Sequence, residues 1–215
     1  MAETVTDTDP PRFVNWLARA LTWAVSKPLW FIRFNGVEHI PARDSGAYLI
    51  AANHQTYIDP GWIGIPIKHP MRFMAWDAAF EWRFVGPLIS YLGAFPVSLE
   101  TGGTIRAMKQ ALRTLRSGGA LVVFPEGARE TPDGQLLPFK SGAVRIALQA
   151  GVPILPVTIG GGNRVWPRGW KLPHIFRRVT VTYHPLLHVT EEESVELHEN
   201  LDRWTSKLKE IIGSV

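Results

Sequence analysis

The segment Asn53-His54-Gln55-Thr56-Tyr57-Ile58-Asp59 holds a histidine and an aspartate with four residues between them. A turn over this distance can bring the carboxylate of Asp59 to one ring nitrogen of His54. The carboxylate then fixes the tautomer of the imidazole, and the second ring nitrogen can take a proton near neutral pH. The same spacing also fits a simpler arrangement, in which Asp59 caps a helix beside a hydrogen-bonded core histidine.

No nucleophile accompanies this pair in the sequence. The 215 residues include no cysteine, and no serine stands in a Gly-x-Ser-x-Gly elbow. This pattern indicates that the substrate supplies the hydroxyl, and it disfavours a hydrolase with its own nucleophile. The lack of cysteine also excludes disulfides, zinc–thiolate sites and iron–sulfur clusters, and we expect no metal site.

A second polar segment, Phe124-Pro125-Glu126-Gly127-Ala128-Arg129, follows an apolar run. Gly127 lets a ligand approach the backbone closely, and the planar guanidinium of Arg129 can bind a phosphate through two parallel hydrogen bonds. Taken alone, the segment also fits an ordinary turn with a surface arginine.

Both polar segments begin where a predicted strand ends. Short apolar runs predict strands at 30–36, 47–54, 71–76, 93–100, 119–127, 152–160 and 178–186. Helical periodicity is found at 104–118, 140–151 and 191–212. Strands that alternate with helices predict an α/β fold, with a mixed, mostly parallel central sheet flanked by helices. Ligands of such sheets bind beyond the carboxyl ends of the strands, which is where both polar segments begin.

An N-terminal polar leader and amphipathic helix are predicted over residues 1–29, ahead of an α/β domain over residues 30–215. Pro28 is expected to end or kink this helix. At 100° per residue, the apolar residues of this helix fall within one arc of about 160°, called here the apolar arc. Its members are Phe13, Trp16, Leu17, Ala20, Leu21, Trp23 and Ala24. The opposite side of the helix carries Asn15, Arg19, Thr22 and Ser26.

Two interpretations of the apolar arc stay open. It can dock on the main domain, or it can lie in a membrane interface. In the second case four basic residues would lie near lipid phosphates. They are Arg12, Arg19, Lys27 and Arg33.

The charge balance is mildly basic, with 23 Lys and Arg against 19 Asp and Glu and a formal net charge of +4. This excess suits anionic partners such as phosphate esters, coenzymes or acidic lipid headgroups. The uncharged stretch 146–163 is interrupted by prolines and glycines, so it predicts strand and turn rather than a bilayer-spanning helix. The acidic N-terminus does not fit a signal peptide, and no nucleic-acid recognition motif is found.

Together the motifs resemble those of the glycerolipid acyltransferase family, in particular its bacterial 1-acylglycerol-3-phosphate acyltransferases. The family has four ordered motifs, which match NHQTYID, GAFPVSLE, FPEGAR and VPILPV. The segment PFKSGA (138–143) is similar to the stretch that follows the third motif. The resemblance extends from about Trp30 to Leu187.

The resemblance implies a reaction and a role for the histidine–aspartate pair. His54 would be the general base that takes the proton from the sn-2 hydroxyl of 1-acyl-sn-glycerol-3-phosphate, and Asp59 would orient it. The hydroxyl would attack the thioester of acyl-CoA or acyl carrier protein without an acyl-enzyme intermediate, giving phosphatidic acid for phospholipid biosynthesis. No cofactor is implied beyond this co-substrate.

The resemblance also implies a set of substrate-binding residues. Arg129 would bind the acceptor phosphate, Lys140 would lie near the reacting centre, and Pro153 would be structural. The implied set is Phe124, Pro125, Glu126, Gly127, Arg129 and Lys140.

One position departs from the family pattern. The second motif commonly ends in an arginine that contacts the acceptor phosphate, and Leu99 stands at the matching position. Helical periodicity places Arg106 on the solvent side, so it does not replace that arginine. Another lyso-lipid acceptor, or a non-catalytic lipid-binding protein of this fold, therefore stays open. The expected partners are a lysophospholipid, an acyl donor and anionic lipids at the cytoplasmic face of the cell membrane, with peripheral or monotopic attachment.

Overall fold

The computed structural model describes residues 12–97, 103–129, 134–167, 169–190 and 196–215. Its central feature is a seven-stranded sheet with strand order β1-β7-β6-β2-β5-β3-β4. Neighbouring strands run parallel, except for β6 and β7, which pair antiparallel. The predicted mixed, mostly parallel sheet is confirmed.

The strands are β1 (Arg33–Asn35), β2 (Tyr48–Ala52), β3 (Met71–Trp76), β4 (Ala94–Val97), β5 (Ala120–Val123), β6 (Ile154–Gly160) and β7 (Thr180–Tyr183). The helices are α1 (Arg12–Trp30), α2 (Asp59–Gly64), α3 (Val85–Tyr91), α4 (Gly103–Arg116), α5 (Gly142–Ala150), α6 (Gly162–Val165) and α7 (Leu197–Ile212). Two 3-10 helices, η1 (Val37–His39) and η2 (Asp77–Glu81), complete the fold. The short helices α2, α3 and α6 are not predicted from the sequence, and the first residues of the predicted 191–212 helix lie outside the described part of the chain.

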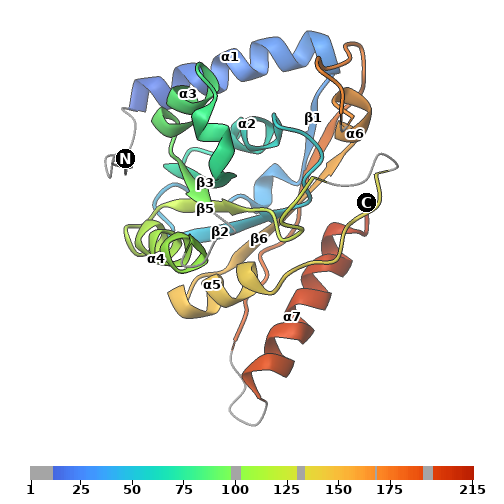
Figure 1. Ribbon diagram of the computed structural model, residues 1–215. Coiled ribbons are helices and arrows are strands. Elements are labelled where there is room, and N and C mark those ends of the chain that lie inside the picture. Colours follow the sequence, from blue (N-terminus) through green and yellow to red (C-terminus); the bar gives the residue numbers. More distant parts are fainter. Residues whose placement is uncertain (1–11, 98–102, 130–133, 168, 191–195) are drawn as a thin grey trace.

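Helices cover both faces of the sheet, with α1, α2 and α3 over one face and α4, α5 and α7 over the other (Figure 1). The central strand β2 is buried along its whole length. Its side chains alternate between the two apolar clusters of the core. Tyr48, Ile50 and Ala52 belong to the cluster that also contains Trp62 of α2. Leu49 and Ala51 belong to the cluster under α4, α5 and α7.

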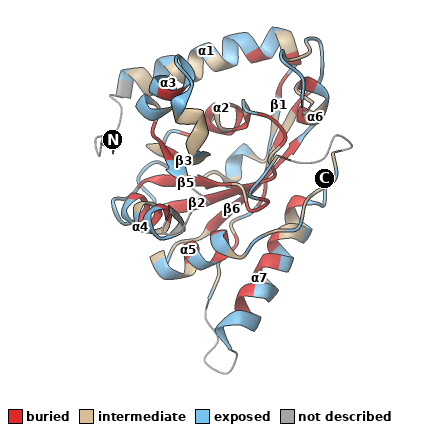
Figure 2. Ribbon diagram, in the orientation of Figure 1, coloured by how far each residue is buried: buried red, intermediate tan, exposed pale blue. Residues whose placement is uncertain are grey.

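The helix α1 faces the domain with its polar side. The Arg19 Nε donates to the carbonyl of Ile65 at 2.9 Å, and the indole N–H of Trp62 donates to the buried hydroxyl of Ser26 at 3.0 Å. Much of α1 is coloured as exposed or intermediate in Figure 2, and the apolar arc is exposed. Its large side chains expose 45–68% of their surface, namely Phe13, Trp16, Leu17, Leu21 and Trp23.

This orientation rules out docking of the apolar arc on the main domain, the first of the two interpretations drawn from the sequence. An exposed apolar face of this size is typical of a surface that meets a lipid or protein partner. No helix in the described residues is both long and apolar enough to cross a bilayer.

Of the two outcomes expected at Pro28, the ending of α1 is wrong, because the helix continues through Pro28 to Trp30. Tertiary contacts hold this last turn. Trp30 is buried, its ring meets the ring of Trp62 edge-on at 5.5 Å between centroids, and its indole N–H donates to the carbonyl of His174 at 2.8 Å. Proline this close to a helix end removes one hydrogen bond, which these contacts offset.

The orientation of α1 predicts which of its residues matter for folding. The double variant Trp16→Ser/Leu21→Ser removes only exposed side chains, so its free energy of unfolding should stay within about 1 kcal/mol of the parent chain. Ser26→Leu forces extra volume into a packed position and removes the Trp62 hydrogen bond, so it should cost about 1–3 kcal/mol. Urea unfolding followed by circular dichroism measures both values. The opposite ranking would show that α1 docks through its apolar arc.

Candidate active site

The two polar segments meet beyond the carboxyl ends of β2 and β5, which are neighbours in the sheet. The backbone N–H of His54 donates to Glu126 Oε1 at 2.8 Å. The imidazole ring of His54 stacks on the ring of Phe124, with centroids 4.1 Å apart and planes at 18°. The structure thus brings together the two polar segments that the sequence places at strand ends.

The carboxylate of Asp59 is fully buried and accepts four hydrogen bonds. Its Oδ2 accepts from His54 Nδ1 at 2.9 Å and from the backbone N–H groups of Gln55 at 2.6 Å and Thr56 at 2.8 Å. Its Oδ1 accepts from the hydroxyl of Thr56 at 2.7 Å. Asp59 is also the first residue of α2, where the helix dipole favours a negative charge. Of the two arrangements considered from the sequence, the structure shows the contact with His54, because the Asp59 side chain makes no capping hydrogen bond to α2.

The contact with Asp59 sets the tautomer of His54. A carboxylate only accepts hydrogen bonds, so the proton of the neutral imidazole is assigned to Nδ1 and the lone pair to Nε2. The His54 side chain is 20% exposed, and Nε2 has no hydrogen-bond partner among the residues that the structure describes. This nitrogen is therefore placed to accept a proton from a bound molecule.

Glu126 fastens the His54 loop to the segment that follows β5. Its second oxygen, Oε2, accepts from the backbone N–H of Leu137 at 2.8 Å, and the residue is only 4% exposed. Burial raises the pKa of the Glu126 carboxyl above its ordinary value, and the N–H groups of His54 and Leu137 act in the opposite direction. Both oxygens are engaged with backbone groups, so this geometry favours positioning of His54 over the direct acceptor contact implied by the resemblance.

The neighbours of His54 in the chain anchor the loop on its other side. The side-chain amide of Asn53 bonds both backbone groups of Ile159, donating at 2.9 Å and accepting at 2.7 Å. The Gln55 Oε1 accepts from the backbone N–H groups of Gly162 at 2.6 Å and Asn163 at 3.3 Å. Sequence reasoning did not assign these roles. The signal was present in the run of polar residues directly after a buried strand.

Arg129 lies against Tyr57, a residue between His54 and Asp59 in the chain. Its guanidinium carbon is 3.8 Å from the centroid of the Tyr57 ring, and one of its terminal nitrogens donates to the Tyr57 hydroxyl at 3.1 Å. Trp82 and Trp166 meet the Tyr57 ring edge-on, with centroids 5.8 and 5.4 Å away. The other terminal nitrogen of Arg129 is buried without a hydrogen-bond partner within the described ranges. A cation with unused donors thus lies in the same loop cluster as the histidine.

The remaining expected residues lie as follows. Gly127 has φ +67°, and a Cβ added there would lie 2.9 Å from the Lys140 Nζ, so Lys140 lies directly beside the third motif. The backbone N–H of Lys140 donates to the carbonyl of Pro125 at 2.9 Å, and the carbonyl of Pro153 accepts from Leu49 at 3.0 Å. Arg106 is exposed on α4, as periodicity predicts. Leu99 lies outside the described residues.

Comparison with known proteins identifies the family of the chain. The acyltransferase family profile matches residues 31–160, which include both polar segments. The chain is 26% identical over 159 residues to the chloroplastic 1-acyl-sn-glycerol-3-phosphate acyltransferase BAT2 of Brassica napus, covering 74% of this chain and 45% of that protein. It is 31% identical over 136 residues to the 1-acyl-sn-glycerol-3-phosphate acyltransferase of Bacillus subtilis, covering 61% and 65% of the two chains.

The fold also has a relative among solved structures. The crystal structure of the 1-acyl-sn-glycerophosphate acyltransferase PlsC from Thermotoga maritima superposes with a TM-score of 0.70 at 26% identity, covering 95% of this chain and 81% of that one. The chain therefore belongs to the acyltransferase family, and the resemblance seen in its motifs is confirmed. It spans about half the length of the chloroplastic relatives that it matches.

The buried carboxylate of Asp59 predicts a large effect on stability. Asp59→Ala leaves several buried donors without an acceptor, which should lower the free energy of unfolding by about 2–5 kcal/mol. Asp59→Asn keeps one oxygen for the N–H donors and can turn its NH₂ group toward the Thr56 hydroxyl. Its free energy of unfolding should therefore fall by only about 1–2 kcal/mol. Chemical unfolding of the two variants measures the difference. Equal stability of Asp59→Ala and the parent chain would show that the loop does not depend on this carboxylate.

Proposed function

We propose that the protein transfers an acyl group from acyl-CoA or acyl carrier protein to the free sn-2 hydroxyl of 1-acyl-sn-glycerol-3-phosphate, giving phosphatidic acid. The observation that carries this proposal is the unpartnered Nε2 of His54, held by a buried carboxylate in the same loop cluster as the free donors of Arg129. Membership of the acyltransferase family and the names of its relatives support the choice of reaction.

In the proposed mechanism His54 acts as a general base. Its Nε2 takes the proton from the acceptor hydroxyl as the hydroxyl oxygen attacks the thioester carbonyl. The imidazolium that forms is stabilised by the Asp59 carboxylate at 2.9 Å. The carbon–sulfur bond then breaks, and the thiol leaves with the proton that His54 returns. The acyl group passes directly from the donor sulfur to the acceptor oxygen, so no acyl-enzyme intermediate forms.

Arg129 supplies the proposed phosphate contact. Its guanidinium is preorganised by stacking on Tyr57, and one of its terminal nitrogens has no hydrogen-bond partner among the described residues. In our proposal Glu126 positions the His54 loop, while Phe124, Pro125, Gly127 and Lys140 line the approach to the reacting centre.

We also propose that the acceptor reaches the site from the cytoplasmic face of an anionic membrane, to which the protein attaches peripherally. The outward apolar arc of α1 supports this, since exposed tryptophans with basic neighbours suit the headgroup region of a bilayer. Lys27 and Arg33 are exposed near the carboxyl end of this helix.

One prediction of the proposed function concerns His54 as the general base. His54→Ala should lower the turnover number by roughly 10²–10⁴, because it removes proton transfer in the transition state. The fold should persist, since the ring is partly exposed and Asp59 keeps its backbone donors. Acyl transfer from a labelled thioester to lysophosphatidate measures the rate. The matched control is His198→Ala, which removes the histidine of an exposed His198–Asp202 pair (3.3 Å) on α7 and should change nothing. Turnover of His54→Ala within about threefold of the parent chain would refute the role.

Another prediction of the proposed function concerns binding of the acceptor by Arg129. Arg129→Ala should raise the apparent KM for lysophosphatidate roughly 10- to 150-fold, the equivalent of about 1.5–3 kcal/mol for a lost charge-assisted contact, and leave the donor KM nearly unchanged. Arg113→Ala, an exposed arginine on α4, is the control. Assays with lyso-lipids that lack the phosphomonoester test the alternative acceptors. An unchanged KM in Arg129→Ala would point to another acceptor or another contact.

A further inference from the structure

We infer that the protein has a second lipid-binding surface, separate from the apolar arc of α1, that inserts into an anionic bilayer. It consists of Phe31 and residues 169–178 and is called here the aromatic turn. The inference rests on the proposed function only in taking the acceptor to be a membrane lipid. The aromatic turn lies at the carboxyl end of α1 and beside α6 (Figure 1).

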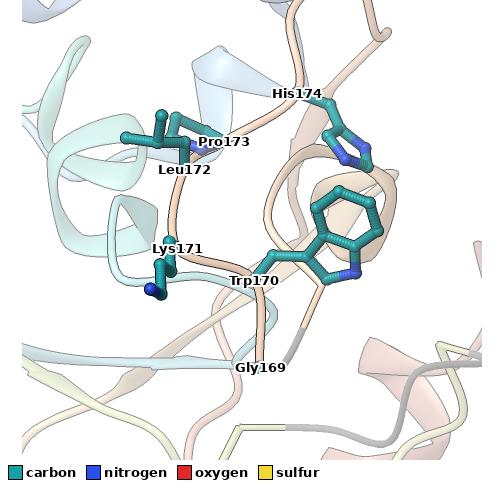
Figure 3. Close-up of a pocket in the computed structure, with 6 residues that line it drawn as sticks. All are labelled: Gly169, Trp170, Lys171, Leu172, Pro173 and His174. Carbon is teal, nitrogen blue, oxygen red and sulfur yellow. The ribbon is translucent and has the colours of Figure 1, made fainter.

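The aromatic turn exposes large apolar side chains on the surface of the described structure. They are Phe31 (45%), Trp170 (59%), Leu172 (76%), Ile175 (48%) and Phe176 (63%). Gly169–His174 also line an open hollow of about 600 Å³, with Trp170 and His174 on one side of the chain and Lys171 and Leu172 on the other (Figure 3). Apolar side chains with a lysine between them match the boundary between acyl chains and headgroups.

The backbone of the aromatic turn is fixed to the rest of the molecule. The N–H of Phe176 donates to the carbonyl of Leu29 at 2.6 Å. The N–H of His174 donates to the carbonyl of Val165 at 2.7 Å. The indole N–H of Trp166 donates to the carbonyl of Trp170 at 2.9 Å. The apolar side chains are therefore presented to the outside by a held scaffold.

Two phenylalanines in this surface adopt a conformation that disfavours side chains. Phe31 has φ +43° and Phe176 has φ +58°, and the remaining positive φ values in the described residues belong to glycines. Their rings are 6.4 Å apart and both are exposed. Burial in the core cannot account for these rings, and glycine would relieve the backbone strain. A contact outside the chain gives the exposed rings a reason to be kept.

The charge around the aromatic turn selects an anionic partner. The sequence from 134 to 190 contains seven Lys and Arg and no Asp or Glu. Lys171, Arg177 and Arg178 are exposed within the aromatic turn, and Arg33 is exposed two residues after Phe31. Basic residues that flank exposed aromatic side chains match anionic lipid, because the rings enter the interface while the cations meet phosphate groups.

The aromatic turn also connects the bilayer to the candidate active site. Trp166 bonds the carbonyl of Trp170 and packs edge-on against Tyr57, which holds Arg129. Insertion of the aromatic turn together with the arc of α1 would therefore bring the phosphate-binding arginine to the level of the headgroups. The expected partner is a lipid surface rather than an acidic protein, since the exposed apolar side chains lie at the carboxyl end of α1, the helix that carries the exposed arc.

Flotation with vesicles tests the inference on the full chain. The probes are vesicles of phosphatidylcholine with one quarter phosphatidylglycerol, and vesicles of phosphatidylcholine alone. Leu172→Ser/Phe176→Gly should lower the partition coefficient for the anionic vesicles at least tenfold, with a melting temperature equal to or above that of the parent chain. Arg177→Gln/Arg178→Gln should weaken binding to anionic vesicles and leave binding to neutral ones unchanged.

The matched control is Ile105→Ser/Leu197→Ser, which removes two exposed apolar side chains (63% and 54%) from α4 and α7 on the other face of the sheet. It should bind both vesicles as the parent chain does. Partitioning of Leu172→Ser/Phe176→Gly within twofold of the parent chain would overturn the inference, and so would an equal loss in the control. An acidic protein as the true partner would give the first of these results.

The readout separates this inference from the proposed function. Vesicle binding does not require turnover, so a protein without acyltransferase activity could still confirm the aromatic turn. If Trp16→Ser/Leu21→Ser loses binding while Leu172→Ser/Phe176→Gly keeps it, α1 alone is the membrane contact and the aromatic turn is excluded. A parent chain that binds neither vesicle would refute both membrane contacts, while activity on a short-chain acceptor in solution would leave the proposed chemistry standing.

Discussion

The buried carboxylate of Asp59 connects the candidate site to the rest of the molecule. It receives the ring N–H of His54 and three further donors, so it sets both the tautomer of the imidazole and the path of the loop. Asp59 is also the first residue of α2. Three residues later in this helix, Trp62 donates a hydrogen bond to Ser26 of α1. The six-residue helix α2 thus links His54, through Asp59, to α1, through Trp62. A movement of His54 relative to α1 would break these buried hydrogen bonds.

Most polar groups around His54 are used for structure. Asn53 and Gln55 bond the backbone near β6 and α6, and both oxygens of Glu126 bond backbone N–H groups. Within the described residues, the Nε2 of His54 and a terminal nitrogen of Arg129 are groups of the site that keep unused hydrogen-bonding capacity. A base and a cation left unpaired in an otherwise satisfied cluster fit an acceptor that carries both a hydroxyl and an anionic group.

The sequence predicted the sheet because most of its strands are short apolar runs bounded by glycine or polar residues, although β1 (Arg-Phe-Asn) is not such a run. It also placed both polar segments directly after two of these runs. It could not predict which way α1 faces, since periodicity defines an apolar arc but not what lies against it. The helix through Pro28 depends on burial of Trp30, which is a tertiary effect. The positioning role of Glu126 depends on two backbone groups, one of them 72 residues away, and the stack of Arg129 on Tyr57 likewise joins two distant segments.

A double-mutant cycle on turnover tests the central claim, that Asp59 acts in the reaction through His54. The four proteins are the parent chain, His54→Ala, Asp59→Asn and the double variant, each assayed for acyl transfer to lysophosphatidate after its fold has been verified. If the two residues act as one unit, the double variant should be no slower than His54→Ala alone, because the carboxylate then has no imidazole to orient. If the fold-losses of turnover in the two single variants multiply in the double variant, this account is contradicted and Asp59 has a separate role.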